Sequence, residues 1–499
     1  MKITLRVMFI FAILAGLSLS AYLLASMRTY RLGFPLDDAW IHQTYARNLA
    51  LWGEWAFIHG QPSAGSTAPL WSAILALGYI LKVNPYLWTF SMGGMFLFAL
   101  ALVSLQGFRE LGVKLFSQDN QFVWSIGAGI LLLLEWHMVW AAASGMETLS
   151  FSLLVTLILI WLAAGWKSWF LLGVFIAMSI WMRPDGVTLL GPAVLVLAIT
   201  NTNWPARLKA AVLLSLGFGL LFLPYLFFNR LLAGSFWPNT FYAKQAEYAL
   251  LQSIPLWRRW LQQVSVILVG AGALLLPGFL YFTWRAYRQK VWPVLIGIGW
   301  VMAYLGLYAW RLPLIYQHGR YVMPVMPVIF LWGYCGLEMW FHTNTGNRLH
   351  NLLSRAWLFS TGLVLLSFWI LGASSYGRDV AVIESELVDT ANWIAENTAP
   401  DELVAAHDIG ALGYWGKRRL LDLAGLISPE VIPFIRDERL LAYYLSEKKV
   451  EYLVTFPGWY PVLTRCASQL YQGSRDFSHQ QGGESMTVYR WIPDCVKNK

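Results

Sequence analysis

Charged residues are scarce in this sequence: Lys, Arg, Asp and Glu together make up 13% of its 499 residues, whereas 58% are hydrophobic. So little charge does not cover the water-facing surface of a soluble chain of this length. The sequence also lacks a glycine-rich phosphate loop with its lysine, a CxxC metal framework and an HExxH helix. These absences argue against nucleotide hydrolysis and metalloprotease chemistry. We therefore predict an α-helical polytopic membrane protein.

Cysteine is rare as well, with three in the whole chain. Cys335 lies inside an apolar run, which predicts a packing role. Cys466 and Cys495 both lie in a polar C-terminal region. The pair fits a disulfide if that region faces an oxidising compartment, and the sequence alone leaves open whether the two are bonded.

Long apolar runs dominate the rest of the chain and predict about eleven membrane spans of roughly 15–23 residues. The runs lie at about 5–27, 86–105, 122–143, 148–164, 168–182, 187–200, 210–228, 262–283, 292–310, 321–341 and 357–376. The stretch 148–200 fits either three short helices or two longer ones. The first run resembles a signal peptide, but with further spans downstream we interpret it as an uncleaved span. Residues 69–81 are apolar too but end at a Lys-Val-Asn-Pro break, so we expect an interfacial or partly inserted helix there.

The basic residues predict the orientation of these spans, because cytoplasmic loops carry an excess of Lys and Arg. If the spans alternate, one side carries Lys2/Arg6, Arg109/Lys114, Lys167, Arg207/Lys209, Arg285/Arg288/Lys290 and Arg348/Arg355. That side is predicted to be the cytoplasm. The net charge of +9 is scattered between apolar runs, so it indicates topology signals and contacts with membrane lipids rather than nucleic acid.

From about Gly377 the composition becomes that of a soluble domain. Alternating and amphipathic patterns predict helices over 379–397 and 429–449 and strands over 402–406, 419–423, 451–456 and 486–492. The chain is thus divided into a membrane part, 1–376, and a small α/β domain, 377–499. An odd number of spans places this domain on the outer, extracytoplasmic face.

Two adjacent carboxylates, Asp37 and Asp38, follow the first span, and His42 lies one helical turn beyond Asp38. Carboxylates at a membrane edge are costly and often functional, and a neighbouring cation or burial can tune one as a general base. The alternative is a simple N-cap of a helix over 39–52, which Gly53 ends. No cofactor is firmly indicated; a divalent cation on Asp38 and His42 is an open alternative.

Further polar residues fall on the same predicted face. Arg320, beside His318, presents a planar fork suited to phosphate, and Lys244 adds a point charge; each also fits a snorkelling side chain. Glu147 fits either a substrate site or a solvated turn or N-cap. The Arg183–Asp185 pair fits either a substrate site or a helix-ending turn. The expected substrate-binding residues are His42, His59, Glu147, Arg183, Asp185, Asn239 and Tyr242. Glu135 and His137, inside an apolar run, fit a satisfied core pair or a cavity lining.

An ordered set of motifs in the membrane part resembles bacterial membrane glycosyltransferases of the GT-C fold. The likeness is nearest to mycobacterial-type arabinofuranosyltransferases and more distant to protein mannosyltransferases and the aminoarabinose transferase of lipid A. The motifs are Asp37-Asp-Ala-Trp-Ile-His-Gln-Thr-Tyr-Ala-Arg-Asn-Leu49, Trp52-Gly, Gly65-Ser-Thr-Ala-Pro-Leu-Trp71, Ser144-Gly-Met-Glu147, Arg183-Pro-Asp-Gly186, Pro238-Asn-Thr-Phe-Tyr-Ala-Lys244 and Arg320-Tyr.

The resemblance implies an inverting transferase that takes a sugar from a polyprenyl-phosphate donor and moves it to a hydroxyl of a glycan or lipid at the outer face of the membrane. The base of the family maps onto Asp37 or Asp38, with Asp37 preferred, and Arg320, Lys244 and His318 would hold the phosphate. The sequence departs from the family at Ser63-Ala64-Gly65, where relatives usually carry an acidic residue.

Two other functions fit part of the pattern. Intramembrane Glu135, His137 and Asp185 would suit a lipid or sugar transporter or flippase, although the acids gather on one face and no paired broken helices are evident. A ligase that transfers a whole lipid-linked oligosaccharide is the second alternative. Products separate the three functions: transport forms no glycosidic bond, and a ligase transfers a block of sugars.

Overall fold

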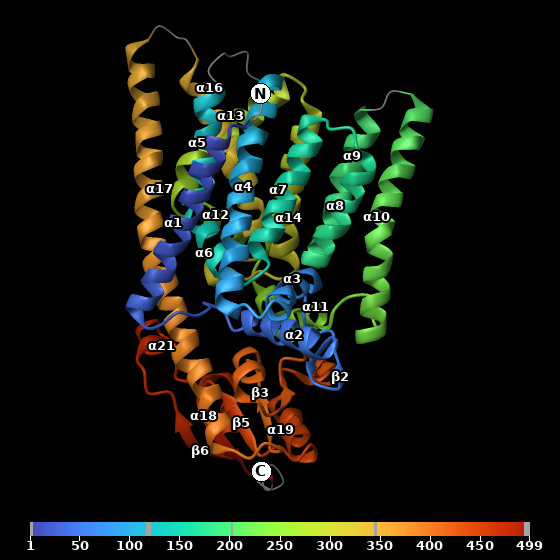
Figure 1. Ribbon diagram of the computed structural model, residues 1–499, viewed down its shortest axis with the longest axis vertical. Helices are drawn as coiled ribbons and strands as arrows, with labels where there is room; N and C mark the ends of the chain where they lie inside the picture. The colour runs from blue at the N-terminus through green and yellow to red at the C-terminus, as the bar shows by residue number, and fades with distance from the viewer. Residues whose placement is uncertain (1–2, 116–120, 201–202, 344–346, 494–499) are drawn as a thin grey trace.

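The computed structural model describes residues 3–115, 121–200, 203–343 and 347–493 and shows a long helical bundle with a small sheet domain at one end (Figure 1). The bundle helices run roughly along the long axis of the molecule. The chain enters the bundle with α1 at the end farthest from the sheet, and its last described strand, β7, belongs to the sheet. This is the predicted combination of an α-helical membrane part and a C-terminal α/β domain.

Each predicted apolar run is mostly helical, although two of the runs are divided into a bent pair of helices. The bundle consists of α1 (Leu5–Thr29), α4 (Pro85–Leu115), α5 (Gln121–Leu134), α6 (Trp136–Ala143), α7 (Thr148–Ala164), α8 (Trp169–Met182), α9 (Leu190–Thr200), α10 (Trp204–Ala233), α12 (Leu256–Ile267), α13 (Ala271–Arg288), α14 (Trp292–Arg311), α16 (Met326–Phe341) and α17 (Arg348–Val382). Within the described residues, six helices are long and apolar enough to span a membrane, and two bent pairs raise this to eight. The stretch 148–200 forms three short helices, so the count of eleven spans stays a prediction.

The predicted run 122–143 is broken at Glu135, which separates α5 from α6 by a bend of 53°. Glu135 has an extended backbone, and its side chain accepts a hydrogen bond of 3.1 Å from the backbone N–H of Met138. It therefore acts as the N-cap of α6. A second bend, of 107°, separates α12 from α13, where Gly270 adopts a left-handed backbone (φ 85°).

The centre of the bundle is α16, almost all of whose side chains are buried. It packs tightly on α13, where a Cβ on Gly336 would lie 1.8 Å from the carbonyl oxygen of Gly278. Only glycine permits this approach, as is common where membrane helices cross. By contrast, α10 and α17 expose rows of large apolar side chains, which suits contact with lipid.

Short elements lie between the bundle and the sheet domain. They are α2 (Asp38–Trp52), the hairpin β1 (Ala56–Ile58) and β2 (Gln61–Pro62), α3 (Pro69–Ile80) and α11 (Asn239–Glu247). The predictions of helix over 39–52 and 69–81 are confirmed, and Gly53 ends α2 in a left-handed conformation (φ 68°). The hairpin was not predicted.

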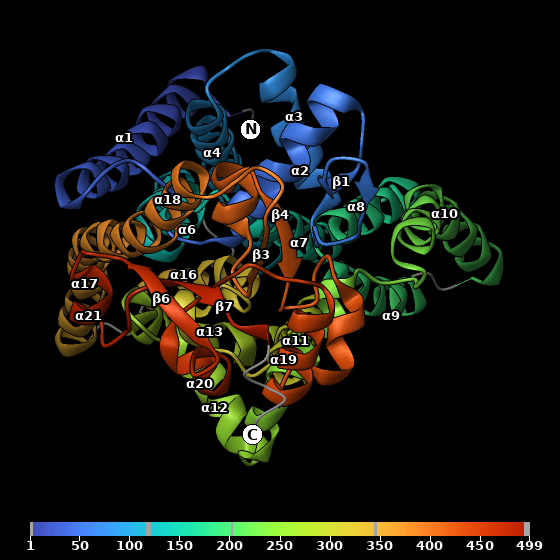
Figure 2. The ribbon, with the colours of Figure 1, turned by 90° about the horizontal axis from the view of Figure 1, so that it is seen from below.

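The C-terminal domain contains α18 (Asp389–Asn397), α19 (Glu438–Glu447) and a five-stranded sheet in the order β4-β3-β5-β7-β6 (Figure 2). The strands are β3 (Leu403–Ala406), β4 (Arg419–Asp422), β5 (Tyr452–Thr455), β6 (Ala467–Gln472) and β7 (Thr487–Trp491). Strands β4, β3 and β5 are parallel, and β7 and β6 are antiparallel additions. All were predicted except β6, whose exposed face lacks an apolar alternation.

The predicted boundary between 1–376 and 377–499 falls inside α17, which continues from the bundle into the domain as one helix. The division at that residue stays a prediction. Cys335 is free and buried, as its apolar run indicated. Cys466 is disulfide-bonded, while Cys495, the other cysteine of that pair, lies outside the described residues.

The basic helix ends lie away from the sheet domain. The end of α4 with Arg109, the start of α10 with Arg207, and the start of α17 with Arg348 all lie at the upper end of Figure 1. The polar motifs of the sequence lie at the opposite end, so the predicted separation of basic loops from candidate site residues is present. Its assignment to cytoplasm and exterior stays a prediction.

Candidate functional site

Three charged side chains from distant parts of the chain meet at the end of the bundle that faces the C-terminal domain. Asp38 begins α2, Lys244 belongs to α11, and Arg320 precedes α16. The Asp38 carboxylate accepts a hydrogen bond from Arg320 and lies 3.4 Å from Lys244 Nζ. The Tyr321 hydroxyl accepts hydrogen bonds from both cations, at 2.9 Å and 3.0 Å. We call Asp38, Lys244 and Arg320 the ion cluster.

The electrostatics of the ion cluster favour its charged form. Burial alone would raise the pKa of Asp38, but the charges of Lys244 and Arg320 hold that pKa well below its ordinary range. Burial alone would lower the pKa of Lys244, but Asp38 raises it above the ordinary value. Arg320 is 5% exposed, and its Nε and Nη1 have no hydrogen-bond partner among the described residues. A buried guanidinium with unused donors is a ready site for an anion.

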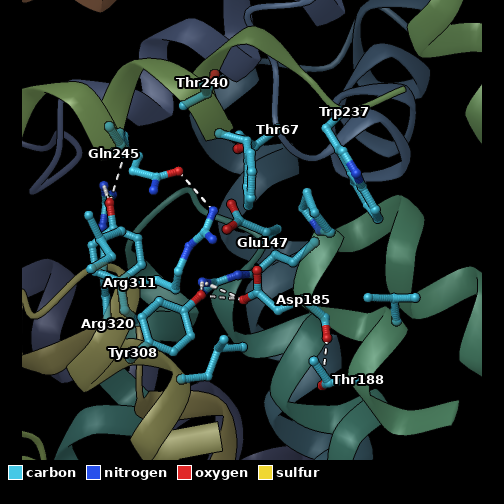
Figure 3. Close-up of a pocket in the computed structure, with 18 of the residues that line it drawn as sticks. Thr67, Glu147, Asp185, Thr188, Trp237, Thr240, Gln245, Tyr308, Arg311 and Arg320 are labelled. Carbon is cyan, nitrogen blue, oxygen red and sulfur yellow. Dashed lines mark hydrogen bonds and ion pairs between the residues drawn. The ribbon is translucent and has the colours of Figure 1, made fainter. Parts of the chain in front are cut away.

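A first cavity, of about 410 Å³, opens on one side of the ion cluster (Figure 3). Its polar wall carries Arg183, which lies 2.9 Å from Asp185 and donates a hydrogen bond of 2.6 Å to the Tyr308 hydroxyl. Arg311 on the same wall donates a hydrogen bond of 2.8 Å to the amide oxygen of Gln245. Most of the remaining lining is apolar or aromatic and includes Trp237, Phe241, Leu307, Trp310 and Leu312. We call this space the bundle cavity.

Glu147 also lines the bundle cavity, and it is linked to His42 of α2. His42 Nε2 lies 3.4 Å from the Glu147 carboxylate, while its Nδ1 lies within hydrogen-bond distance of Ser66 and Ser72. Burial alone would raise the pKa of Glu147, but the contact with His42 and the charge of Arg183 lower it. His42 therefore holds the side chain of Glu147 in place at the wall of the bundle cavity.

A second cavity, of about 400 Å³, lies on the other side of the ion cluster, between the bundle and the C-terminal domain. Asp38, Lys244 and Arg320 line both cavities, so the ion cluster forms their common wall. The opposite wall comes from the domain and includes His407, Asp408 and Trp459. We call this space the domain cavity.

Asp37 lines the domain cavity, but its carboxylate is bound to the domain backbone. Its two oxygens accept hydrogen bonds of 2.7 Å from the N–H groups of Gly410 and Ala411. Burial and the nearby charge of Asp408 raise the pKa of Asp37, against the two backbone hydrogen bonds, which lower it. Burial also raises the pKa of Asp408. Asp37 thus joins the first loop of the bundle to the domain.

A second contact joins α11 to the domain. His407 Nε2 lies 3.2 Å from the carboxylate of Glu247, and its Nδ1 lies 2.8 Å from the Tyr460 hydroxyl. Burial alone would lower the pKa of His407, but Tyr460 and Glu247 raise it well above its ordinary value. Glu247, at the end of α11, therefore connects the helix that carries Lys244 to the C-terminal domain.

The other predicted site residues lie outside the two cavities. Asn239 is buried and donates a hydrogen bond of 3.3 Å to the carbonyl of Leu426, so it anchors α11 to the domain. Tyr242 is 39% exposed and packs against Phe241. His59 lies in the exposed hairpin, 2.9 Å from Glu54.

His318 is two residues from Arg320 but points to a different place. Its Nε2 lies 2.7 Å from Asp379 of α17. The turn that separates it from Arg320 is unusual, since Gln317 (φ 54°) and His318 (φ 56°) both have left-handed backbones without being glycine. The predicted association of His318 with the phosphate-binding cations is therefore not present in the ion cluster.

Several cavity residues were missed by the sequence analysis. His407 and Asp408 directly follow a predicted strand, and the carboxyl ends of parallel strands are common positions for ligand sites, so that signal was available. Tyr308 lines the bundle cavity, and both Tyr308 and Tyr304, one turn before it on α14, donate hydrogen bonds to Asp185. The signal in the sequence was the spacing of four residues between these tyrosines, which puts both on one face of a helix over 292–310.

A divalent cation on Asp38 and His42 has little support in the geometry. In the parts of the chain that the structure describes, no group of three His, Cys, Asp or Glu side chains could hold a metal ion. The contacts of the two residues named in that alternative do not suit a shared metal ion, because Asp38 faces two cations and His42 contacts serines and Glu147.

Comparison with known proteins shows the fold class of this chain. A family model described as a domain of unknown function (DUF8728) matches residues 378–489, which is most of the C-terminal domain. No curated protein matches the chain. Solved structures similar over nearly the full length show that the whole chain, membrane part and domain together, has a GT-C fold.

Two of the similar structures are of ArnT from Cupriavidus metallidurans. The structure bound to undecaprenyl phosphate has a TM-score of 0.61 at 14% identity and covers 96% of this chain and 97% of its own. The apo structure has a TM-score of 0.55 at 15% identity and covers 97% and 98%. At this identity the likeness shows the fold, and it is the fold that the sequence motifs predicted. The nearer likeness to arabinofuranosyl- or mannosyltransferases stays a prediction.

Proposed function

We propose that this chain is an inverting membrane glycosyltransferase that moves one sugar from a polyprenyl-phosphate donor to a hydroxyl of a glycan or lipid acceptor. The proposal depends mainly on one observation, the position of the ion cluster between two cavities. Asp38, Lys244 and Arg320 form a wall with one cavity on each side. A transfer reaction needs this arrangement, because donor and acceptor must reach the same groups from different directions.

The bundle cavity is the proposed donor site. Arg320 and Lys244 supply positive charge at one end, and Arg320 has two unused buried donors for phosphate oxygens. The aromatic and aliphatic lining that starts at Trp237 and Phe241 suits the first isoprene units of a lipid. The GT-C fold, shared with a protein solved with undecaprenyl phosphate, supports a donor of this class.

The domain cavity is the proposed acceptor site. Its walls come from both the bundle and the C-terminal domain, which assigns the domain a part in holding the acceptor glycan. The contacts of Asp37 with Gly410 and of Glu247 with His407 keep that wall in place. In a bacterial cell envelope the site would face the exterior, opposite the basic helix ends.

In the proposed reaction the acceptor oxygen attacks the anomeric carbon and forms the new glycosidic bond while the bond to phosphate breaks. A carboxylate takes the acceptor proton, and the polyprenyl phosphate leaves as an anion bound by Arg320 and Lys244. When those cations turn to the donor phosphate, Asp38 loses its partners and becomes a stronger base.

This geometry favours Asp38 as the base over Asp37, which the resemblance preferred. Both oxygens of Asp37 are already occupied by backbone N–H groups of the domain, whereas Asp38 lines both cavities. Asp37 then acts as a positioning residue. Glu147 and the Arg183–Asp185 pair would bind the transferred sugar, which is a hexosyl or pentosyl group.

The experiment incubates the purified protein in lipid nanodiscs with a panel of radiolabelled polyprenyl-phosphate sugars and an envelope glycan extract. The proposal expects release of polyprenyl phosphate together with a glycan longer by one residue and of inverted anomeric configuration. Movement of label without a new glycosidic bond would indicate a transporter or flippase, and addition of a whole oligosaccharide a block transferase. Either result would overturn the proposal.

A further inference from the structure

A third cavity, of about 570 Å³, adjoins the domain cavity and has no part in the chemistry described above. Tyr316, Gln317, Val382 and Ile383 line both cavities and form their common border. The third cavity lies beside α6, the bend between α12 and α13, and α17. We call it the side cavity.

The side cavity contains buried polar atoms without partners. His137 is fully buried, its Nδ1 lies 2.8 Å from Glu135, and its Nε2 has no hydrogen-bond partner among the described residues. If Nδ1–H donates to Glu135, Nε2 is an acceptor. The side-chain oxygen of Gln317 is likewise buried and unpartnered. Unused buried polar atoms that line a cavity indicate a ligand that supplies hydroxyl or amide groups.

Other polar groups in the side cavity are partly accessible. Asp379 is held between His318 Nε2, at 2.7 Å, and Trp140 Nε1, at 2.9 Å. A carboxylate and an imidazole oriented in this way can accept and donate hydrogen bonds to neighbouring hydroxyls. The rings of Trp136 and Trp140 lie 5.1 Å and 5.2 Å from that of His318 and give the cavity aromatic walls.

The charge of the lining limits the class of ligand. Among the described residues that line the side cavity there is no Lys or Arg, so it does not repeat the phosphate-binding chemistry of the ion cluster. Aromatic rings beside hydrogen-bonding groups suit a neutral, polyhydroxylated ligand, whose C–H faces pack on the rings and whose hydroxyls reach the polar atoms.

We propose that the side cavity is a second saccharide subsite for the acceptor. It would hold a neutral sugar unit next to the one in the domain cavity, so the preferred acceptor is a chain of at least two neutral sugar units. The inference rests on the proposed function, which makes the domain cavity the acceptor site. The strained turn at Gln317 and His318 then has a purpose, because it directs these two side chains into the acceptor cavities while Arg320 reaches the donor.

The test measures binding of labelled oligosaccharides, one to four units of mannose, glucose, galactose or arabinose, to the protein in nanodiscs saturated with undecaprenyl phosphate. For at least one of these four sugars, we expect the trisaccharide to bind at least about tenfold more tightly than the single sugar unit. Val269→Trp, which fills the side cavity, is expected to remove that gain. Val212→Trp is the matched control, because Val212 on α10 has similar exposure and lines none of the three cavities.

A second variant, His318→Asn, keeps a residue that tolerates the left-handed backbone and removes the imidazole. It is expected to lower the affinity for the longer oligosaccharides and leave that for the single sugar unchanged. The inference is overturned if no series gains affinity with length in the wild type, or if Val269→Trp binds every oligosaccharide as the wild type does. Undecaprenyl phosphate binding is measured on the same preparations. Its absence in the wild type would refute the proposed donor and leave the length dependence as a separate result.

Discussion

Asp37 Oδ2 accepts a hydrogen bond of 2.7 Å from the backbone N–H of Gly410, which lies 373 positions further along the chain. This contact explains why the C-terminal domain sits where it does. A carboxylate that accepts two N–H groups at the start of a helical turn is a strong local anchor. The contact also places Asp37 and Asp38 in the lining of the domain cavity.

The first prediction concerns the close approach at this contact. A Cβ on Gly410 would lie 2.1 Å from the backbone carbonyl oxygen of Asp37. Gly410→Ala must therefore push the domain loop away from the bundle, at a cost of about 1–3 kcal/mol. We expect faster hydrogen exchange at 409–411 and a lower melting temperature. Gly416→Ala is the control, because its added Cβ meets its nearest atom at 3.7 Å, and equal effects of the two variants would contradict the account.

The second prediction concerns pH. The pKa values of Asp37 and Asp408 are raised by burial, so the folded state binds more protons than the unfolded one and stability falls as pH rises above about 4. The raised pKa of His407 acts in the same direction, since its stabilising charge is complete below about pH 6.5 and is lost through the folded pKa.

Docking of the domain should therefore be tighter at about pH 6 than at about pH 9. Hydrogen exchange at 407–411, corrected for the intrinsic rate, measures it. His407→Gln should flatten the upper part of the profile because it removes the charge that faces Glu247. Protection that increases from about pH 6 to about pH 9 would show that the sign is wrong.

The third prediction concerns the donor phosphate. Arg320→Met removes the buried guanidinium with unused donors, and hydrogen bonds to charged groups contribute about 1.5–3 kcal/mol. Affinity for undecaprenyl phosphate should fall by about tenfold to about a hundredfold. Arg288→Met, at the exposed end of α13, is the matched loss of a cation. A similar loss of affinity in both variants would mean that Arg320 has no special role.

Much of the fold could be predicted from the sequence because the membrane limits the choices. Apolar runs of span length must be helical in lipid, and every such run is mostly helical here, two of them as bent pairs of helices. The strands of the C-terminal domain other than β6 were recognisable from their own alternation of apolar and polar residues. The bend at Glu135 was not, because a capping carboxylate inside an apolar run looks like any other buried acid.

The site could be predicted only in part. Single motifs indicated Asp38, Lys244 and Arg320, and the structure brings these three together. The different contacts of Asp37 and Asp38 could not be inferred, because neighbours in sequence at the start of a helix point in different directions. The contact of His318 with Asp379 could not be inferred either. Two left-handed residues separate the side chain of His318 from that of Arg320, and local backbone strain leaves no clear mark on a sequence.

The central claim is that Asp38 is the base at the wall between donor and acceptor, and the most direct test is single-turnover transfer by Asp38→Asn. The account predicts that the rate falls by about a hundredfold to ten-thousandfold. Affinity for undecaprenyl phosphate should be unchanged or higher, because a negative charge beside the phosphate is removed. Transfer at a rate near that of the wild type would contradict the account, and so would loss of transfer in Asp37→Asn alone with the domain still docked.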